Sequence, residues 1–217
     1  MANNYYQATG CLQLKAITPV INALFGVFQV KKFDDKLADI RQCENDISYS
    51  SVVKTIQSEM GMKFEKPIED IDVVDVLIAM ATKLGKLDEA KKLLLEEDGT
   101  NILLDPDEDA NLQLLFDLAI AMDDGHGLEL INMSGAWTSI ELGGTGEFIS
   151  KHFSTYADSA YDSAYMGSRV SQYIEDNKLL EAANMLVGNF NATLSNIVDA
   201  TKREEITRMV LAAMAEK

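Results

Sequence analysis

Cysteine and histidine are scarce in this chain of 217 residues, which contains only Cys11, Cys43, His126 and His152. Two cysteines cannot form the disulfide framework of a small secreted scaffold, so both are expected to be free thiols. No spacing among these four residues resembles the ligand pattern of a structural zinc site. Any histidine chemistry must therefore use one or both of the two imidazoles.

Long apolar runs are also missing. The longest apolar stretch, residues 16–30, is interrupted by polar residues, proline and glycine, and no segment reaches the ~18 apolar residues of a membrane span. Residues 1–7 lack the basic and then apolar layout of a secretory signal. The sequence therefore predicts a cytoplasmic protein that does not associate with membranes.

Basic side chains are rare in the middle of the chain. The formal net charge is −16, and residues 61–150 contribute twenty acidic side chains against six basic ones. Residues 111–150 contain no lysine or arginine, so the glycine-rich segment 143–146 lacks the basic side chain that a phosphate loop uses. A negative field repels nucleic acid and attracts basic surfaces. The charge argues against direct nucleic-acid binding and predicts a protein with a basic surface as the partner.

The sequence predicts an α+β fold with a small antiparallel sheet of about three strands. Residues 5–14 have the composition of a first strand, and a hairpin near 128–153 is expected to turn at 143–146, with a bulge at 134–135. Helices should cover one face of this sheet. The polar connection at 33–45 is expected to hold a short helix.

Apolar residues at helical spacing predict most of the remaining chain to be helical. Thr18 and Pro19 have the character of an N-cap followed by a first helical residue. Further helices are expected at residues 50–60, 67–84 and 86–97, from 105 onward, and again from 157 to the C-terminus. We expect a single domain, 1–217, with a largely helical acidic sub-lobe, 46–122, inserted between the first strand and the hairpin.

Two groups of residues form the candidate interaction surface. Glu69, Asp72 and Asp75 lie mostly on the polar side of the helix expected at 67–84. A tandem Asp-Ser-Ala-Tyr repeat places Tyr161 and Tyr165 four residues apart, on one face of a helix. Tyrosine is enriched at binding hot spots, although these two could instead pack the sheet against the C-terminal helices.

Asp123, Asp124, His126 and His152 form an alternative candidate, a mixed carboxylate and imidazole metal site. Close pairing of the hairpin strands would bring the turn histidine and the strand histidine to one side of the sheet. The plainer interpretation gives the two histidines separate structural roles. The acidic segment 105–109 matches a calcium loop only at its first ligand positions, so we interpret it as the capped start of a helix.

Neither a nucleophile motif nor any other specific catalytic signature is present, and the sequence implies no cofactor. It therefore favours a non-enzymatic interaction or regulatory protein that acts through its acidic surface and its tyrosine-rich segment. An inhibitor that imitates the charge of nucleic acid, of the kind encoded by mobile elements or phage, is one form of this hypothesis. The alternative is a small metal-dependent enzyme or metal-binding protein. The sequence leaves the oligomeric state open.

Overall fold

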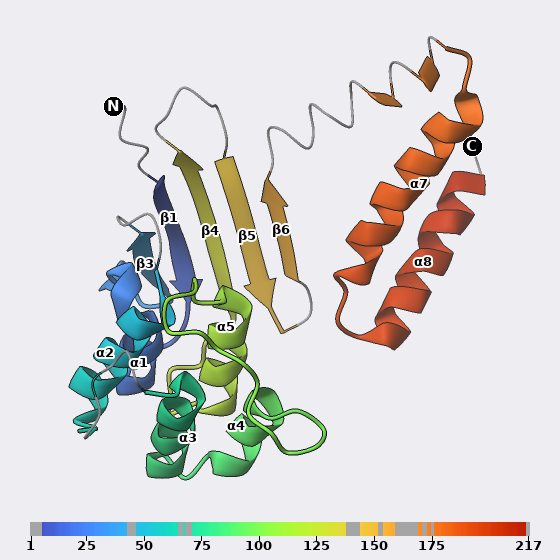
Figure 1. The fold of residues 1–217 in the computed structure, drawn as a ribbon. Helices are drawn as coiled ribbons and strands as arrows, with labels where there is room; N and C mark the ends of the chain where they lie inside the picture. The colour runs from blue at the N-terminus through green and yellow to red at the C-terminus, as the bar shows by residue number, and fades with distance from the viewer. Residues whose placement is uncertain are drawn as a thin grey trace.

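A computed structural model describes residues 6–42, 47–64, 67, 71–137, 144–151, 154–158, 169–170, 173–174 and 176–215. Within these residues the fold is α+β (Figure 1). The strands are β1 (Tyr6–Gln13), β2 (Lys31–Lys32), β3 (Leu37–Gln42), β4 (Leu130–Trp137), β5 (Gly144–Ser150) and β6 (Ser154–Asp158). The helices are α1 (Pro19–Phe25), the short 3₁₀ helix η1 (Gly26–Phe28), α2 (Tyr49–Met60), α3 (Val73–Lys83), α4 (Leu87–Leu94), α5 (Leu112–Ala121), α7 (Leu179–Ser195) and α8 (Ala200–Ala215).

The strands form one antiparallel sheet in the order β2-β3-β1-β4-β5-β6. The expected first strand and the pairing of the hairpin strands are confirmed, since β1 pairs with β4 and β4 pairs with β5. The expected turn at 143–146 is wrong, because Gly144, Thr145 and Gly146 belong to β5 and pair with Ala136, Gly135 and Ser134. The expected size of about three strands is wrong, because β3 replaces the helix expected at 33–45 and β6 extends the sheet beyond the hairpin. The expected bulge is also absent from β4, where Ser134 and Gly135 pair with Thr9 and Ala8 in continuous register.

The sheet has one covered side and one open side. Ala8, Leu12, Ile40, Ile131 and Ile149 are buried and project from four neighbouring strands toward the covered side. Because successive strand residues point to opposite faces, the residues between them reach the other side. That other side is largely polar, with Gln7, Thr9, Arg41, Asn132 and Ser134 exposed.

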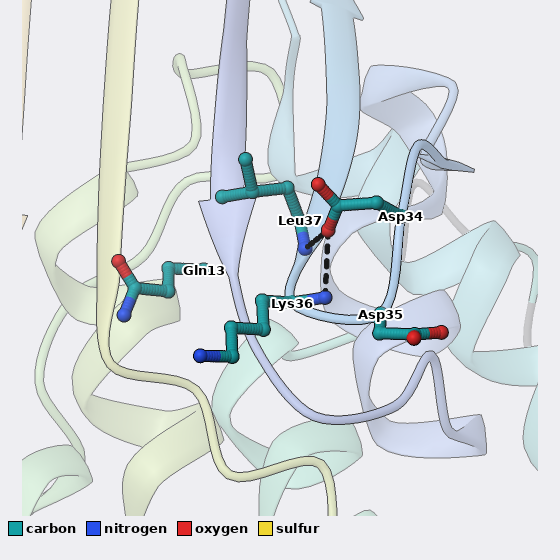
Figure 2. A pocket seen from close by; sticks show the side chains of 5 residues that line it. All are labelled: Gln13, Asp34, Asp35, Lys36 and Leu37. Carbon is teal, nitrogen blue, oxygen red and sulfur yellow. Dashed lines mark hydrogen bonds between the residues drawn. The ribbon is translucent and has the colours of Figure 1, made fainter.

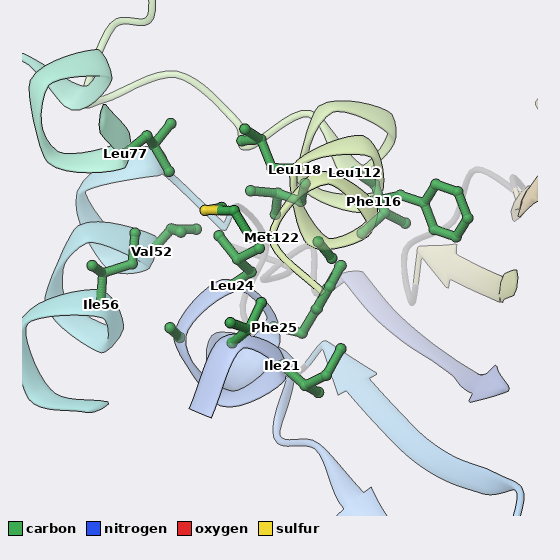
Figure 3. Close-up of a cluster of buried hydrophobic side chains, with 14 of the residues drawn as sticks. Ile21, Leu24, Phe25, Val52, Ile56, Leu77, Leu112, Phe116, Leu118 and Met122 are labelled. Atoms are coloured by element: carbon green, nitrogen blue, oxygen red, sulfur yellow. The ribbon is translucent and has the colours of Figure 1, made fainter. Parts of the chain in front are cut away.

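Helices α1 to α5 gather around the end of the sheet where β1 finishes (Figure 1). Their apolar faces meet in one continuous core, part of which Figure 3 shows in close-up. Each fully buried aliphatic or aromatic side chain in it contributes about 1.5–3 kcal/mol to folding. The labelled members are Ile21, Leu24, Phe25, Val52, Ile56, Leu77, Leu112, Phe116, Leu118 and Met122.

Local capping residues determine where the helices begin and end. Thr18 caps α1 as expected, with its Oγ1 accepting a hydrogen bond from the backbone N–H of Ile21 at 3.5 Å. Gly61 ends α2 in the left-handed conformation, with φ +58°, also as expected. Two expected starts are wrong: α3 begins at Val73 rather than at Pro67, and α5 begins at Leu112 rather than near residue 105. In both helices a later side chain provides the cap.

The expected C-terminal helices are present as α7 and α8. Asp199 starts α8, since its Oδ1 accepts a hydrogen bond from the Lys202 backbone N–H at 3.0 Å. The helix therefore begins at Ala200, the residue after this cap. None of the helices within the described residues combines the length and the apolar character that crossing a bilayer requires.

Candidate functional site

The N-terminus of α3 and the loop after α4 meet at an acidic surface. Asp72 caps α3, because its Oδ1 accepts a hydrogen bond from the Val74 backbone N–H at 2.8 Å. Its second oxygen, Oδ2, accepts a hydrogen bond from Asn101 Nδ2 at 3.2 Å. One carboxylate thus joins two segments that lie 29 residues apart in sequence.

Asn101 belongs to a tight loop that carries three further carboxylates. Leu95 and Asn101 pair as an isolated antiparallel bridge, and the Glu96 backbone N–H donates to the Thr100 carbonyl oxygen at 2.8 Å. Asp98 Oδ1 accepts hydrogen bonds from the Thr100 hydroxyl at 2.7 Å and from the Thr100 backbone N–H at 2.9 Å. These hydrogen bonds lower the pKa of the Asp98 carboxyl, the bond from the hydroxyl contributing most. These contacts hold the backbone of the loop and the side chain of Asp98 in place.

We call this surface the acidic corner and define it as Asp72, Asp75, Glu96, Glu97 and Asp98. Asp75 lies in the first turn of α3, three residues from Asp72 and therefore on the same side of the helix start. All five residues are exposed to solvent. Within the described residues none of the five takes part in an ion pair. Their charge is therefore presented to the solvent without an opposing partner.

The second acidic segment, Asp105–Asp109, has a structural role at the start of α2. The backbone N–H groups of Tyr49 and Ser50 donate to the carbonyl oxygens of Glu108 and Pro106, at 3.1 and 2.8 Å. Asp105 Oδ1 accepts from the Asp107 backbone N–H at 2.9 Å and closes a turn, not a helix. The interpretation of this segment as a helix cap is therefore wrong, and Asn111 caps α5 instead.

The sequence-based interaction residues are only partly within the described structure. Asp72 and Asp75 lie in the acidic corner, whereas Glu69, Tyr161 and Tyr165 lie outside the described residues. The three loop carboxylates of the corner were not predicted as site residues. Their local signal was a run of acidic residues immediately after a helix, but only the contact between Asp72 and Asn101 connects that run to α3.

The alternative metal candidate lies in the loop between α5 and β4. Asp123, Asp124 and His126 each offer a ligand atom within 4.8 Å of the others, while His152 lies outside the described residues. His126 is fully buried, with 0% of its surface exposed. Its Nδ1 accepts a hydrogen bond from the Leu128 backbone N–H at 2.8 Å, and its Nε2 lies 3.0 Å from the Ala119 carbonyl oxygen. Both ring nitrogens are therefore engaged, with the proton on Nε2.

The two aspartates of this loop also bind the backbone. Asp123 Oδ1 accepts from the backbone N–H groups of Gly125 and Gly127, at 2.9 and 3.3 Å, and Asp124 Oδ2 accepts from that of Val20 at 3.3 Å. Partial burial alone would raise the pKa of Asp123, but these hydrogen bonds and the nearby His126 lower it overall. The loop holds the start of α1, the end of α5 and the entry to β4 together. These hydrogen bonds account for the arrangement of the loop.

A hollow of about 480 Å³ lies along the turn between β2 and β3 and is lined by Gln13 and residues 34–37 (Figure 2). Asp34 Oδ1 is engaged there by the backbone N–H groups of Lys36 and Leu37, at 2.7 and 2.8 Å. The described lining contains no cysteine, histidine, serine or threonine.

Cys11, the cysteine within the described residues, is a free thiol in β1. Burial raises its pKa, and so does Asp39, which lies opposite it on β3. A raised pKa keeps the sulfur protonated, whereas a catalytic cysteine needs the thiolate. Cys43 lies outside the described residues. No protein-family model, curated protein or solved structure matches this chain.

Glu147 of β5 is a half-buried carboxylate on the covered side of the sheet, between Met133 and Tyr156 on the flanking strands. Burial raises its pKa above the ordinary value of a glutamate. Ionisation of Glu147 therefore opposes folding. The free energy of unfolding is higher while the carboxyl is neutral and falls as the pH rises through the pKa of the folded state.

We expect Glu147→Gln to raise the melting temperature at about pH 7.5, where the wild-type carboxylate is charged, and to give no gain at or below about pH 3, where it is neutral in both states. Glu97→Gln, on an exposed residue, is the control and should change little at either pH. Thermal unfolding followed by circular dichroism measures both. An equal gain from Glu147→Gln at the two pH values would show that burial of the charge is not the cause.

Proposed function

We propose that this protein is a non-enzymatic binding protein whose acidic corner docks on a basic surface of another protein. The observation that supports the proposal most directly is the hydrogen bond between Asp72 and Asn101, since it brings two acidic segments together. The result is five exposed carboxylates at one junction between helices. Fixed clusters of one charge sign steer oppositely charged partners and increase association rates.

The charge around the corner strengthens this proposal. Residues 71–130 carry fifteen acidic and four basic side chains, a net charge of −11. The basic ones are the lysines at positions 83, 86, 91 and 92, so the chain from Leu93 to Leu130 carries no lysine or arginine. A partner that approaches the loop after α4 therefore meets negative charge from several directions.

A partner that normally holds nucleic acid on its basic surface would be inhibited by such binding. The acidic corner would then occupy the place of phosphates, and the two ligands would exclude one another. The tyrosine-rich segment that includes Tyr161 and Tyr165 remains a proposed second contact region. This narrower form of the proposal predicts that added nucleic acid releases the bound partner.

Neutralising three carboxylates of the corner tests the proposal. Asp75→Asn/Glu96→Gln/Glu97→Gln removes three charges and leaves Asp72 and Asp98, which accept structural hydrogen bonds, in place. We expect this variant to capture at least roughly tenfold less partner from a lysate of the native host than the wild type, because the electrostatic attraction is reduced.

The control variant removes the same number of charges elsewhere. Glu181→Gln/Glu204→Gln/Glu205→Gln changes three exposed glutamates of α7 and α8. It should capture as much partner as the wild type at about 0.1 M salt, and capture by both should fall at about 0.5 M, where screening is stronger. Equal losses from the two triple variants would show that the carboxylates act only as a solubilising coat.

A further inference from the structure

The C-terminal hairpin of α7 and α8 exposes an unusual amount of apolar surface. Helix α7 spans 17 residues and contains a single charged side chain, Glu181. The exposed fractions of Leu180, Val187, Met209 and Leu211 are 70%, 55%, 65% and 58%. Soluble helices normally keep such residues on one buried stripe. Within the described residues, no other segment covers these side chains.

Contact between the two helices accounts for only part of this apolar surface. Ala182 and Leu194 of α7 are 5% and 9% exposed. Leu180 and Val187 lie on the same side of the helix as Leu194, at seven-residue spacing, but further from the loop between the helices, and they are exposed. Figure 1 shows the hairpin beside the sheet, beyond β6. The Ser154 backbone N–H donates to the Asn196 carbonyl oxygen at 3.3 Å and joins the loop between the helices to β6. The outer side of the hairpin is left to solvent.

We propose that two copies of this chain dimerise by packing their α7–α8 hairpins across a two-fold axis into a four-helix bundle. A two-fold interface places identical surfaces against one another, so a strongly charged surface would repel itself. Residues 176–215 carry five acidic and four basic side chains, a net charge of −1, whereas residues 71–130 carry −11. The hairpin is thus suited to self-association, whereas a strongly basic or acidic partner would gain little electrostatic attraction from it.

The area of the exposed apolar surface also favours a second copy of this chain as the partner. Fully burying an aliphatic side chain removes on the order of 100 Å² of apolar surface from water. The exposed large residues of the hairpin are Leu179, Leu180, Leu186, Val187, Val198, Ile206, Met209 and Leu211. Val198 lies in the loop, and Leu211 lies about 200° around α8 from Met209. The other six, with exposed fractions between 39% and 70%, supply roughly 300–350 Å² per copy, which is over half of the apolar part of a standard interface of about 800 Å² per partner. Four helices with such faces form the core of a bundle.

Sedimentation velocity of the full-length protein tests the proposal. At about 50 µM we expect a mass of twice the 23.9 kDa chain. Val187→Glu should raise the dimer dissociation constant at least about 100-fold, because the interface would bury an unpaired charge from each copy. The matched control is Ala192→Glu, on an exposed residue about 140° further around the same helix. It adds the same charge and should leave the dimer intact.

Hydrogen exchange of the wild-type protein supplies a measurement that does not depend on any variant folding. Amides of α7 and α8 should exchange more slowly at about 50 µM than at about 0.5 µM, and those of β1 should not change, if the hairpin forms the interface. A monomer at about 50 µM would overturn the proposal. The proposal would also be overturned if Val187→Glu left the dimer intact while circular dichroism showed that the helices still form. Equal weakening of the dimer by the two glutamate variants would overturn it as well.

Discussion

Replacing His126 with alanine is expected to lower the free energy of unfolding by about 3–5 kcal/mol. The substitution leaves the Leu128 N–H and the Ala119 carbonyl without their buried partner, which costs about 1–3 kcal/mol, and the cavity adds about 2 kcal/mol. Chemical denaturation monitored by circular dichroism measures the loss. The same substitution in a metal site would instead release a bound ion, so the two roles of this histidine predict different results.

The control for this prediction is Asp124→Asn, which keeps an oxygen acceptor for the Val20 N–H at the start of α1. It should cost less than about 1 kcal/mol, since only the charge near the positive end of the helix is lost. Elemental analysis of the wild-type protein completes the test. Stoichiometric zinc, iron or manganese that disappears in both variants would contradict the structural role and support the metal-binding alternative.

The second large effect is expected at Gly10, where β1 and β4 approach most closely. A Cβ atom built at this position would lie 2.1 Å from the Asn132 carbonyl oxygen and 2.8 Å from Met133 Cα. Both are backbone atoms of the neighbouring strand, so no side-chain rotation can relieve the overlap. We expect Gly10→Val to destabilise the protein by about 3 kcal/mol or more, because β1 must separate from β4 at the centre of the sheet.

Gly26→Ala is the matched control for this prediction. Gly26 has φ −59° and ψ −30°, and a Cβ there would lie 3.5 Å from Thr55 Cγ2, an ordinary contact. Its effect should stay within about 1 kcal/mol of the wild type, in either direction. Denaturant unfolding of the two variants measures both effects. Similar losses from Gly10→Val and Gly26→Ala would contradict the close approach of the two central strands.

Strong local signals were sufficient to predict several elements. The Thr18-Pro19 pair and Gly61 define helix ends through their own backbone preferences, and those ends appear where they were expected. The start of α5 was misplaced because Asp105 and Asn111 can both cap a helix. The choice between them depends on packing against α2, which brings Asp105 into a turn. Sequence alone contains no signal for that contact.

The missed strand β3 shows a similar limit. Its six residues alternate as a strand should, with Ala38 and Ile40 buried, but Asp39 and Arg41 give the segment the composition of a polar connection. Pairing with β1 on one side decides its structure. Period-two patterns this short are weak evidence by themselves, and a neighbouring strand is needed to stabilise them.

The candidate site was predictable only in part, because contacts between residues far apart in sequence are not visible in the sequence. The excess of negative charge in the middle of the chain was visible, and Asp72 and Asp75 were expected on the surface. Their association with the loop after α4 depends on a hydrogen bond between residues far apart in sequence. The burial of His126 was equally hidden, because its neighbours, Asp123 to Gly127, have the composition of an exposed turn.

The most direct test of the acidic corner is the amount of partner that two charge-matched variants retain from the same lysate. Asp75→Asn/Glu96→Gln/Glu97→Gln should lose the partner, while Glu181→Gln/Glu204→Gln/Glu205→Gln should hold it as the wild type does. That difference is expected because only the first set belongs to the acidic corner, where the contact between Asp72 and Asn101 brings two acidic segments together. If both variants retain every wild-type partner in full, the acidic corner is not a binding surface.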